Sequence, residues 1–177
     1  GIKLNNEPTE WASGTHEQIR DYLLSFETKW GWANTMVVAH NTLFDGAILS
    51  WKFGIKPKIW ADTMLMSRAV RGVVEKHSLR DTANHYGLGI KGTEVLAAKG
   101  KRREDFTSEE LSRYGDYCVN DVELTHEIFK KLVRGFPAQE LRIIDKTLRM
   151  FIDPILELDL GLLEEHLIDI RHRKDDL

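Results

Sequence analysis

The sequence predicts an α/β fold followed by a helical tail. In the first half of the chain, short apolar runs of strand length alternate with segments of helical periodicity, and from about residue 107 onward helical patterns dominate. The 177 residues are 42% hydrophobic, which is enough to bury one good core. We therefore expect one α/β domain with helices at its C-terminal end.

The amino-terminal segment predicts a short hairpin and then a capped helix. Residues 1–4 and 10–12 lie on either side of a turn-forming Asn-Asn-Glu-Pro, as the two strands of a hairpin do. Thr15 and Gln18 have the spacing of a capping box, and apolar residues then recur at helical intervals. This helix should end near Gly31.

The central segment predicts two strands, each followed by a helix. The apolar run 36–39 has the length of a buried strand, and a helical pattern follows it as far as Gly54. Residues 60–63 predict a brief strand and a turn into a helix over 64–70. This alternation is typical of an α/β domain.

The rest of the chain predicts helices. Thr107 and Glu110 form a second capping box, and Gly115 marks a possible break in the long helix that follows. The expected helical segments are residues 78–87, 93–99, 107–134 and 138–151, and a last helix from residue 162. We find no internal repeat and no low-complexity segment.

Composition narrows the class of protein. A single cysteine, Cys118, rules out a disulfide framework and favours a reducing compartment. No apolar run approaches membrane-spanning length, and the amino terminus carries no export signal, so we expect no membrane partner. The net charge of −3 does not indicate nucleic-acid binding. Lysines 52, 56 and 58 and the cations at 99–103 are either phosphate contacts or solvated surface.

Three side chains form the candidate site. Tyr117 and Asp121 are four residues apart in a helical segment, so the phenol and the carboxylate project from one face. Asp45 lies just past the predicted strand 36–39, in or near the opening of the next helix. Acids at strand ends and on a facing helix are a common way to hold divalent metal. The alternatives are a helix cap for Asp45 and a core aromatic for Tyr117.

Two motifs carry a resemblance to a known family. The segments His40-Asn41-Thr42-Leu43-Phe44-Asp45 and Tyr117-Cys118-Val119-Asn120-Asp121 resemble the second and third motifs of the proofreading 3′–5′ exonuclease domain of family A DNA polymerases, particularly the bacteriophage-like members. These domains belong to the DEDD superfamily. Asp116 stands where histidine-type members carry His, which favours the tyrosine (DEDDy) subclass.

The resemblance implies a fold and a domain plan. The expected fold is ribonuclease H-like, with a mixed sheet flanked by helices and a helical C-terminal tail. Residues 1–136 would form the exonuclease domain, and residues 137–177 a helical segment leading toward a polymerase domain of the same parent chain. The expected location is cytoplasmic or nucleoid-associated, in a cell or encoded by a phage.

The resemblance also implies a chemistry. Two Mg²⁺ or Mn²⁺ ions would hydrolyse the 3′-terminal phosphodiester of single-stranded DNA and release nucleoside monophosphates. Asp121 would hold the ion that activates water, Asp45 would bind the second ion largely through its water shell, and Tyr117 would orient the attacking water. RNA in place of DNA stays open.

The resemblance also implies supporting roles for four further residues. Asn41, Leu43 and Phe44 would line the path of the 3′-terminal nucleotides, although we expect the Phe44 ring to pack inward. Asp62 would support the site from behind, or the fold alone, because it begins a helix.

The first motif of the family, an Asp-x-Glu on the opening strand, is not spelled anywhere before Asp45. Mg²⁺ needs near-octahedral oxygen ligation, so a site with half of its carboxylates should bind the ion weakly. We therefore expect the 177-residue chain by itself to be nearly inactive, and we expect the codons upstream to supply the motif. The alternative is a catalytically vestigial domain that serves a polymerase as a structural platform or a single-strand guide.

Overall fold

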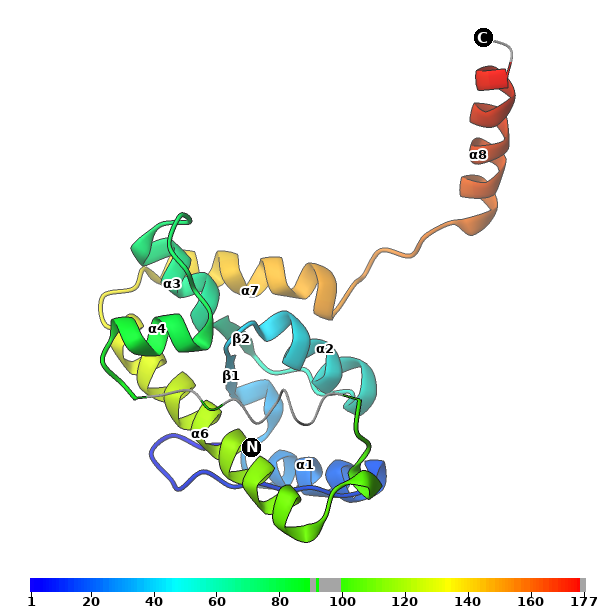
Figure 1. Ribbon diagram of the computed structural model, residues 1–177. Coiled ribbons are helices and arrows are strands. Elements are labelled where there is room, and N and C mark those ends of the chain that lie inside the picture. Colours follow the sequence, from blue (N-terminus) through cyan, green and yellow to red (C-terminus); the bar gives the residue numbers. More distant parts are fainter. Residues whose placement is uncertain (90–91, 93–99, 176–177) are drawn as a thin grey trace.

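The computed structural model describes residues 1–89, 92 and 100–175. Helices surround a small parallel sheet at the centre of the molecule, and a last helix stands apart from this body (Figure 1). The predicted α/β fold with C-terminal helices is confirmed, and the arrangement is consistent with a ribonuclease H-like exonuclease domain. The helix predicted over 93–99 lies outside the described residues.

In place of the predicted hairpin, the structure has one isolated β-bridge. Ile2 and Glu10 exchange two backbone hydrogen bonds of 2.8 Å each, and the residues around them are not strands. The first helix, α1 (His16–Trp30), begins as predicted, because Thr15 and Gln18 form the capping box. It ends at Gly31, whose φ of 70° suits glycine. A short 3₁₀ turn, η1 (Trp32–Asn34), leads into the sheet.

The sheet consists of β1 (Met36–Ala39) and β2 (Ile59–Asp62). The strands run parallel, with Met36 opposite Ile59 and Ala39 opposite Asp62. α2 (Thr42–Phe53) connects them, and Gly54 ends it in the left-handed region. The prediction that β1 is buried is wrong: Met36 is exposed and the other three residues are half-buried. The reason is that, within the described part of the chain, β1 pairs with β2 alone.

Four helices complete the body. They are α3 (Thr63–Arg71), α4 (Leu79–His85), α6 (Ser108–Leu132) and α7 (Ala138–Ile152), with a 3₁₀ turn, η2 (Arg103–Asp105), before α6. α6 packs against β1, α3 and α4, while α2 and α7 pack against β2 and each other. The break expected near Gly115 is absent, since α6 is continuous through it.

Gly115 instead permits a close contact between α6 and the amino-terminal segment. A Cβ atom at this position would lie 2.9 Å from Cε3 of Trp11. The indole therefore packs directly on the helix backbone. The glycine that looks like a helix breaker in the sequence is a packing residue in the fold.

The core joins β2 to four helices, α3, α4, α6 and α7. Its largest fully buried hydrophobic side chains are Trp60, Met66, Ile128, Leu148 and Ile152. Two of these, Leu148 and Ile152, come from α7, so this helix shares the main core. Asp145 of α7 also accepts a 2.8 Å hydrogen bond from the backbone N–H of Trp60.

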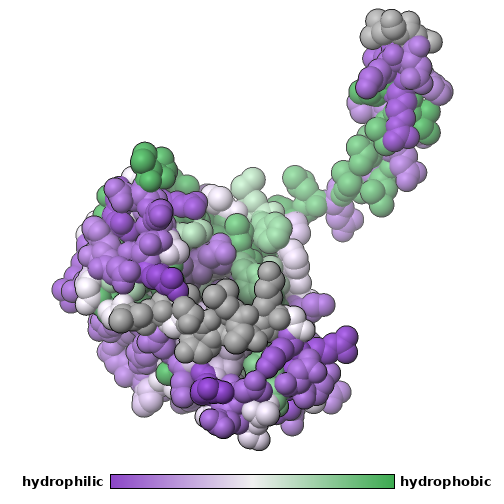
Figure 2. Space-filling model, in the orientation of Figure 1, coloured by the Kyte–Doolittle hydropathy of each residue, from purple (hydrophilic) through white to green (hydrophobic). Residues whose placement is uncertain are grey.

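The last helix, α8 (Leu160–Asp175), begins two residues before its predicted start and buries none of its residues. Figure 1 shows it at the end of an extended linker, away from the body. The linker and α8 carry exposed apolar side chains, seen as green atoms in Figure 2, and Ile155 is 94% exposed. No helix in the described residues is long and apolar enough to span a membrane.

Candidate nuclease site

Asp45 lies in the first turn of α2, just beyond the end of β1. Although Asp45 as a whole residue is exposed, the protein packed around its carboxyl raises the pKa of that group, chiefly by desolvation and further through the negative charge of Asp62. Its own backbone N–H and the amino group of Gly1 act in the opposite direction. A positive charge placed beside this carboxylate, such as a cation, would stabilise its ionised form.

The interpretation of Asp45 as the cap of α2 is wrong. Asn41 holds the N-cap position, in the left-handed conformation with φ of 69°, and its side chain makes no capping bond. The cap comes from another part of the chain. Asp62 accepts hydrogen bonds from the backbone N–H groups of Asn41 at 3.2 Å and Thr42 at 2.8 Å. The carboxylate of Asp45 is therefore not needed to begin the helix.

Asp62 is a buried double cap. Besides the two N–H groups of α2, its carboxylate accepts hydrogen bonds from Met64 at 2.7 Å and Leu65 at 3.2 Å in α3. Four backbone donors satisfy one carboxylate, which fixes the openings of two helices against each other. Its position behind the Asp45 turn agrees with a supporting role.

Tyr117 and Asp121 lie one turn apart on α6, as their spacing predicts. Burial raises the pKa of the Tyr117 phenol, and a hydrogen bond with the Asp121 carboxylate raises it further. The phenol therefore stays protonated and donates to Asp121. One carboxylate oxygen, Oδ1 of Asp121, is buried from solvent.

Gly1 lies against α6 and interacts electrostatically with Asp45. A Cβ atom on Gly1 would lie 3.1 Å from a methyl group of Val122 and 3.3 Å from the carbonyl oxygen of Cys118. The amino group of the same residue interacts with the charge of Asp45. The structure therefore brings the Asp45 end of α2 to the same region as the turn of α6 that holds Tyr117 and Asp121.

A second contact fastens the amino-terminal segment to α6. Glu123 accepts a 2.9 Å hydrogen bond from Lys3 and a shorter one from the hydroxyl of Thr9. These bonds lower the pKa of the Glu123 carboxyl, with Thr9 as the larger cause. Glu123 is therefore occupied in holding the segment, although it stands only two residues from Asp121.

The residues expected along the nucleotide path are on the surface. Phe44 is 67% exposed, so the expectation that its ring packs inward is wrong. The buried face of α2 carries Thr42, Gly46 and Ala47, and Phe44 projects from the opposite face. Leu43 and Asn41 are also exposed. An exposed phenyl ring beside Asp45 is available to stack on a base.

Tyr114 is a neighbour of the site that the motifs do not reveal. Its ring stacks on that of Tyr117, with centroids 5.8 Å apart and planes 30° from parallel, and it also contacts the ring of Phe106, whose plane is tilted by 44°. The i, i+3 spacing of Tyr114 and Tyr117 on a helix is the signal that could have found it. The row of rings helps to hold the phenol of Tyr117 in place.

The donors present fit one divalent cation in part. Within residues 1–89, 92 and 100–175, no three His, Cys, Asp or Glu side chains gather closely enough to hold a metal ion. Mg²⁺, however, commonly binds through one or two carboxylates, several waters and the phosphates of a substrate. Asp45 and Asp121 suit that mode, because both are carboxylates in the region beside Gly1.

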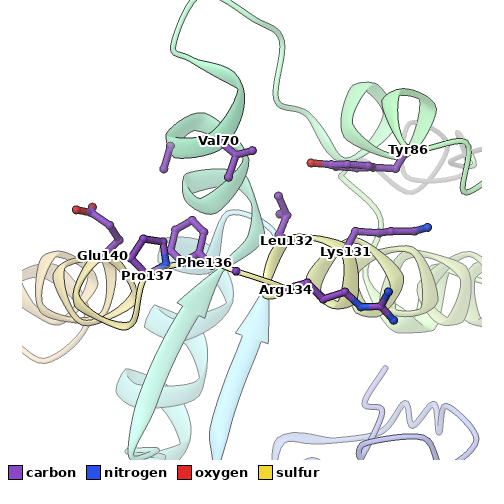
Figure 3. Close-up of a pocket in the computed structure, with 10 residues that line it drawn as sticks. Val70, Tyr86, Lys131, Leu132, Arg134, Phe136, Pro137 and Glu140 are labelled. Carbon is purple, nitrogen blue, oxygen red and sulfur yellow. The ribbon is translucent and has the colours of Figure 1, made fainter.

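A separate cavity of about 530 Å³ lies at the junction of α6 and α7, about three turns along α6 from Asp121 (Figure 3). Tyr86 and Phe136 line it with Lys131. Among its described lining residues Glu140 is the one carboxylate, so the cavity lacks the paired acids of a metal site. The candidate site is therefore the region beside Gly1.

Comparison with known proteins assigns the family. Searches of curated proteins and of solved structures found no match. A family model described as 3′–5′ exonuclease, of the DNA polymerase A type, matches residues 6–136, and this range includes Asp45, Tyr117 and Asp121. The match covers well over half of the chain. The protein therefore belongs to the 3′–5′ exonuclease domain family of family A DNA polymerases.

Proposed function

We propose that this chain is an exonuclease domain that hydrolyses the 3′-terminal phosphodiester of single-stranded DNA, releases nucleoside monophosphates, and edits primer ends for a polymerase, with low activity when the chain is by itself. One observation carries the proposal. Tyr117 and Asp121 are hydrogen-bonded on one face of α6, beside Gly1, whose amino group interacts electrostatically with Asp45. A phenol and two carboxylates in one region are the groups that phosphodiester hydrolysis uses in this family.

Each residue has a role in the proposal. Asp45 and Asp121 would hold Mg²⁺ or Mn²⁺, which when bound supplies an activated water and stabilises charge on the phosphate. Tyr117 is neutral, so its hydroxyl can orient a water without adding negative charge. Asp62 keeps the Asp45 turn in place through its bonds to the opening of α2.

The surface around Asp45 supports the substrate part of the proposal. The exposed Phe44 ring would stack on a terminal base, with Asn41 and Leu43 beside it. Stacking accepts any base, which suits an editing enzyme that removes all four nucleotides. We also propose that residues 1–136 are the exonuclease domain and that residues 137–177 lead toward a polymerase domain, although α7 packs into the common core.

The experiment is a directional digestion. Single-stranded DNA labelled at its 5′ end is incubated with the chain and Mn²⁺, alongside Asp121→Asn and a matched control, Asp116→Asn, on the exposed side of α6. We expect a slow ladder that shortens from the 3′ end. The Asp121 variant should be slower by roughly 100-fold, which equals about 2.7 kcal/mol of transition-state stabilisation, and the control should match the wild type.

Two results would overturn the proposal. Internal cuts or shortening from the 5′ end would show a different nuclease. Binding of the DNA with no cleavage above that of the Asp121 variant, even at high Mn²⁺, would favour the alternative of a domain that guides a single strand without hydrolysing it.

A further inference from the structure

His40 stands at the junction where β1 passes into α2, and both of its ring nitrogens have partners. Nδ1 lies 2.8 Å from the hydroxyl oxygen of Thr63, and Nε2 lies 2.8 Å from the backbone carbonyl oxygen of His77. Thr63 is the first residue of α3, and His77 lies in the loop before α4. One half-buried imidazole therefore joins three segments of the chain.

The partners fix where the ring carries its protons. The carbonyl of His77 can only accept, so Nε2 of His40 carries a proton and donates it. The Thr63 hydroxyl lies within hydrogen-bond distance of Nδ1 and, at 3.2 Å, of the carbonyl oxygen of Ala39. The Thr63 hydroxyl can donate only one hydrogen bond, so it donates either to Nδ1 of His40 or to the carbonyl oxygen of Ala39. A neutral His40 receives that proton, whereas a charged His40 donates at both nitrogens and leaves the hydroxyl bonded to Ala39.

The far end of the His40 bond is itself held in place. The side chain of His77 is buried, with Nε2 2.8 Å from the carbonyl oxygen of Gly72 and Nδ1 2.9 Å from the hydroxyl of Ser67. Arg71 approaches the same hydroxyl at 3.4 Å. The loop between α3 and α4 is therefore anchored to α3, and it offers His40 a fixed acceptor.

The near end of the bond adjoins the candidate site. The residues that follow His40 are Asn41 and Thr42, whose N–H groups are bound by Asp62. Asp45 lies in the first turn of the helix that these residues open. A ring that is held on both sides prevents the strand end from rotating, and the left-handed turn at Asn41 then aims the helix.

We propose that His40 is a positioning residue for Asp45: through Thr63 and the carbonyl of His77 it fixes the turn that opens α2. The inference rests on the proposed function for its catalytic consequence alone. The structural part is that His40 immobilises the turn at residues 41 and 42, which protects the backbone amides of these residues from hydrogen exchange.

The test compares His40→Ala with a matched control, His172→Ala, in exposed α8. Amide hydrogen exchange followed by NMR should be roughly tenfold faster at Asn41 and Thr42 in the His40 variant, with no change in the control. In the nuclease assay, kcat should fall with KM nearly unchanged, because the DNA-facing Phe44 remains in place while Asp45 is misaligned.

A second variant covers the case in which His40→Ala does not fold. Thr63→Val removes only the hydroxyl that meets Nδ1, and Thr63→Ser restores it. We expect faster exchange at residues 41 and 42 in the valine variant and recovery in the serine variant. Unchanged exchange in a folded His40→Ala or in Thr63→Val would overturn the inference, even if the wild type proves to be a nuclease. If the wild type does not cleave DNA, the exchange result still decides the positioning role.

Discussion

The carboxylate of Asp62 accepts a 2.8 Å hydrogen bond from the backbone N–H of Thr42, across the parallel pair of strands. The same carboxylate caps α3, where it accepts from Met64 and Leu65. One side chain at the end of β2 thus begins its own helix and the helix that carries Asp45. The geometry of the candidate site depends on this shared cap.

Asp62→Ala should therefore destabilise the fold strongly. It leaves four backbone N–H groups without their acceptor at a buried position, and we expect the free energy of unfolding to fall by about 3 kcal/mol. Asp81→Ala, at the exposed opening of α4, is the control and should cost less than about 1 kcal/mol. Urea unfolding followed by circular dichroism measures both. Equal losses in the two variants would contradict the double cap.

The effect of Gly115→Ala on stability should depend on whether the Trp11 ring is present. Alanine favours a helix over glycine by about 0.5–1 kcal/mol, but its Cβ would lie 2.9 Å from the Trp11 ring. We expect a net loss of stability in the wild type. In a Trp11→Ala background, the same change should stabilise by about 0.5–1 kcal/mol. A double-mutant cycle measures the coupling, and a stabilising effect in both backgrounds would show that the ring does not pack on α6.

The contribution of Glu110 to the stability of the N-terminus of α6 should depend on pH. Hydrogen bonds from the backbone N–H of Thr107 and from Lys101 lower the pKa of this exposed carboxyl to about 2. A folded pKa below the unfolded value, near 4.3, means that the contribution is complete above about pH 4.3 and is lost as the pH falls toward 2.

Glu110→Gln should accordingly lower the urea midpoint at pH 7 and have no effect near pH 2. Glu109→Gln, in the same first turn, controls for charge at the helix start. A gap between wild type and the Glu110 variant that stays constant from pH 7 to pH 2 would rule out the lowered pKa.

The helix α7 should behave as part of the main body. Leu148→Ala removes a fully buried side chain and should cost about 3 kcal/mol, whereas Met150→Ala, two residues away and 80% exposed, should cost almost nothing. Thermal or urea unfolding compares them. Two separate transitions, with Leu148→Ala shifting only one, would show that α7 folds apart from the sheet.

Local signals in the sequence predicted most of the elements. Thr15 and Thr107 each begin a helix as part of a capping box, since the bonds involved span only three residues. The strand at 36–39 follows from its apolar run. Tyr117 and Asp121 face the same way because four residues make about one helical turn.

The errors concern contacts between distant segments. Gly115 is a weak helix former in isolation, and nothing in its neighbourhood predicts that Trp11 lies on it. The apolar side chain of Phe44 predicts a buried ring, but the face of α2 that packs is set by the sheet and α7. The cap of α2 comes from Asp62 in a later strand. Such partners depend on the tertiary fold, which helical periodicity does not encode.

The proposed function requires that Asp45 and Asp121 form one metal site. Paramagnetic broadening by Mn²⁺ tests it directly, because the ion broadens the amide signals of nearby residues whether or not DNA is cleaved. We predict that the signals of Asp45, Tyr117 and Asp121 broaden together over one range of Mn²⁺ concentration, and that Asp121→Asn abolishes the broadening at Asp45 as well. Broadening at Asp45 that survives in Asp121→Asn unchanged would show that the two carboxylates do not share a site.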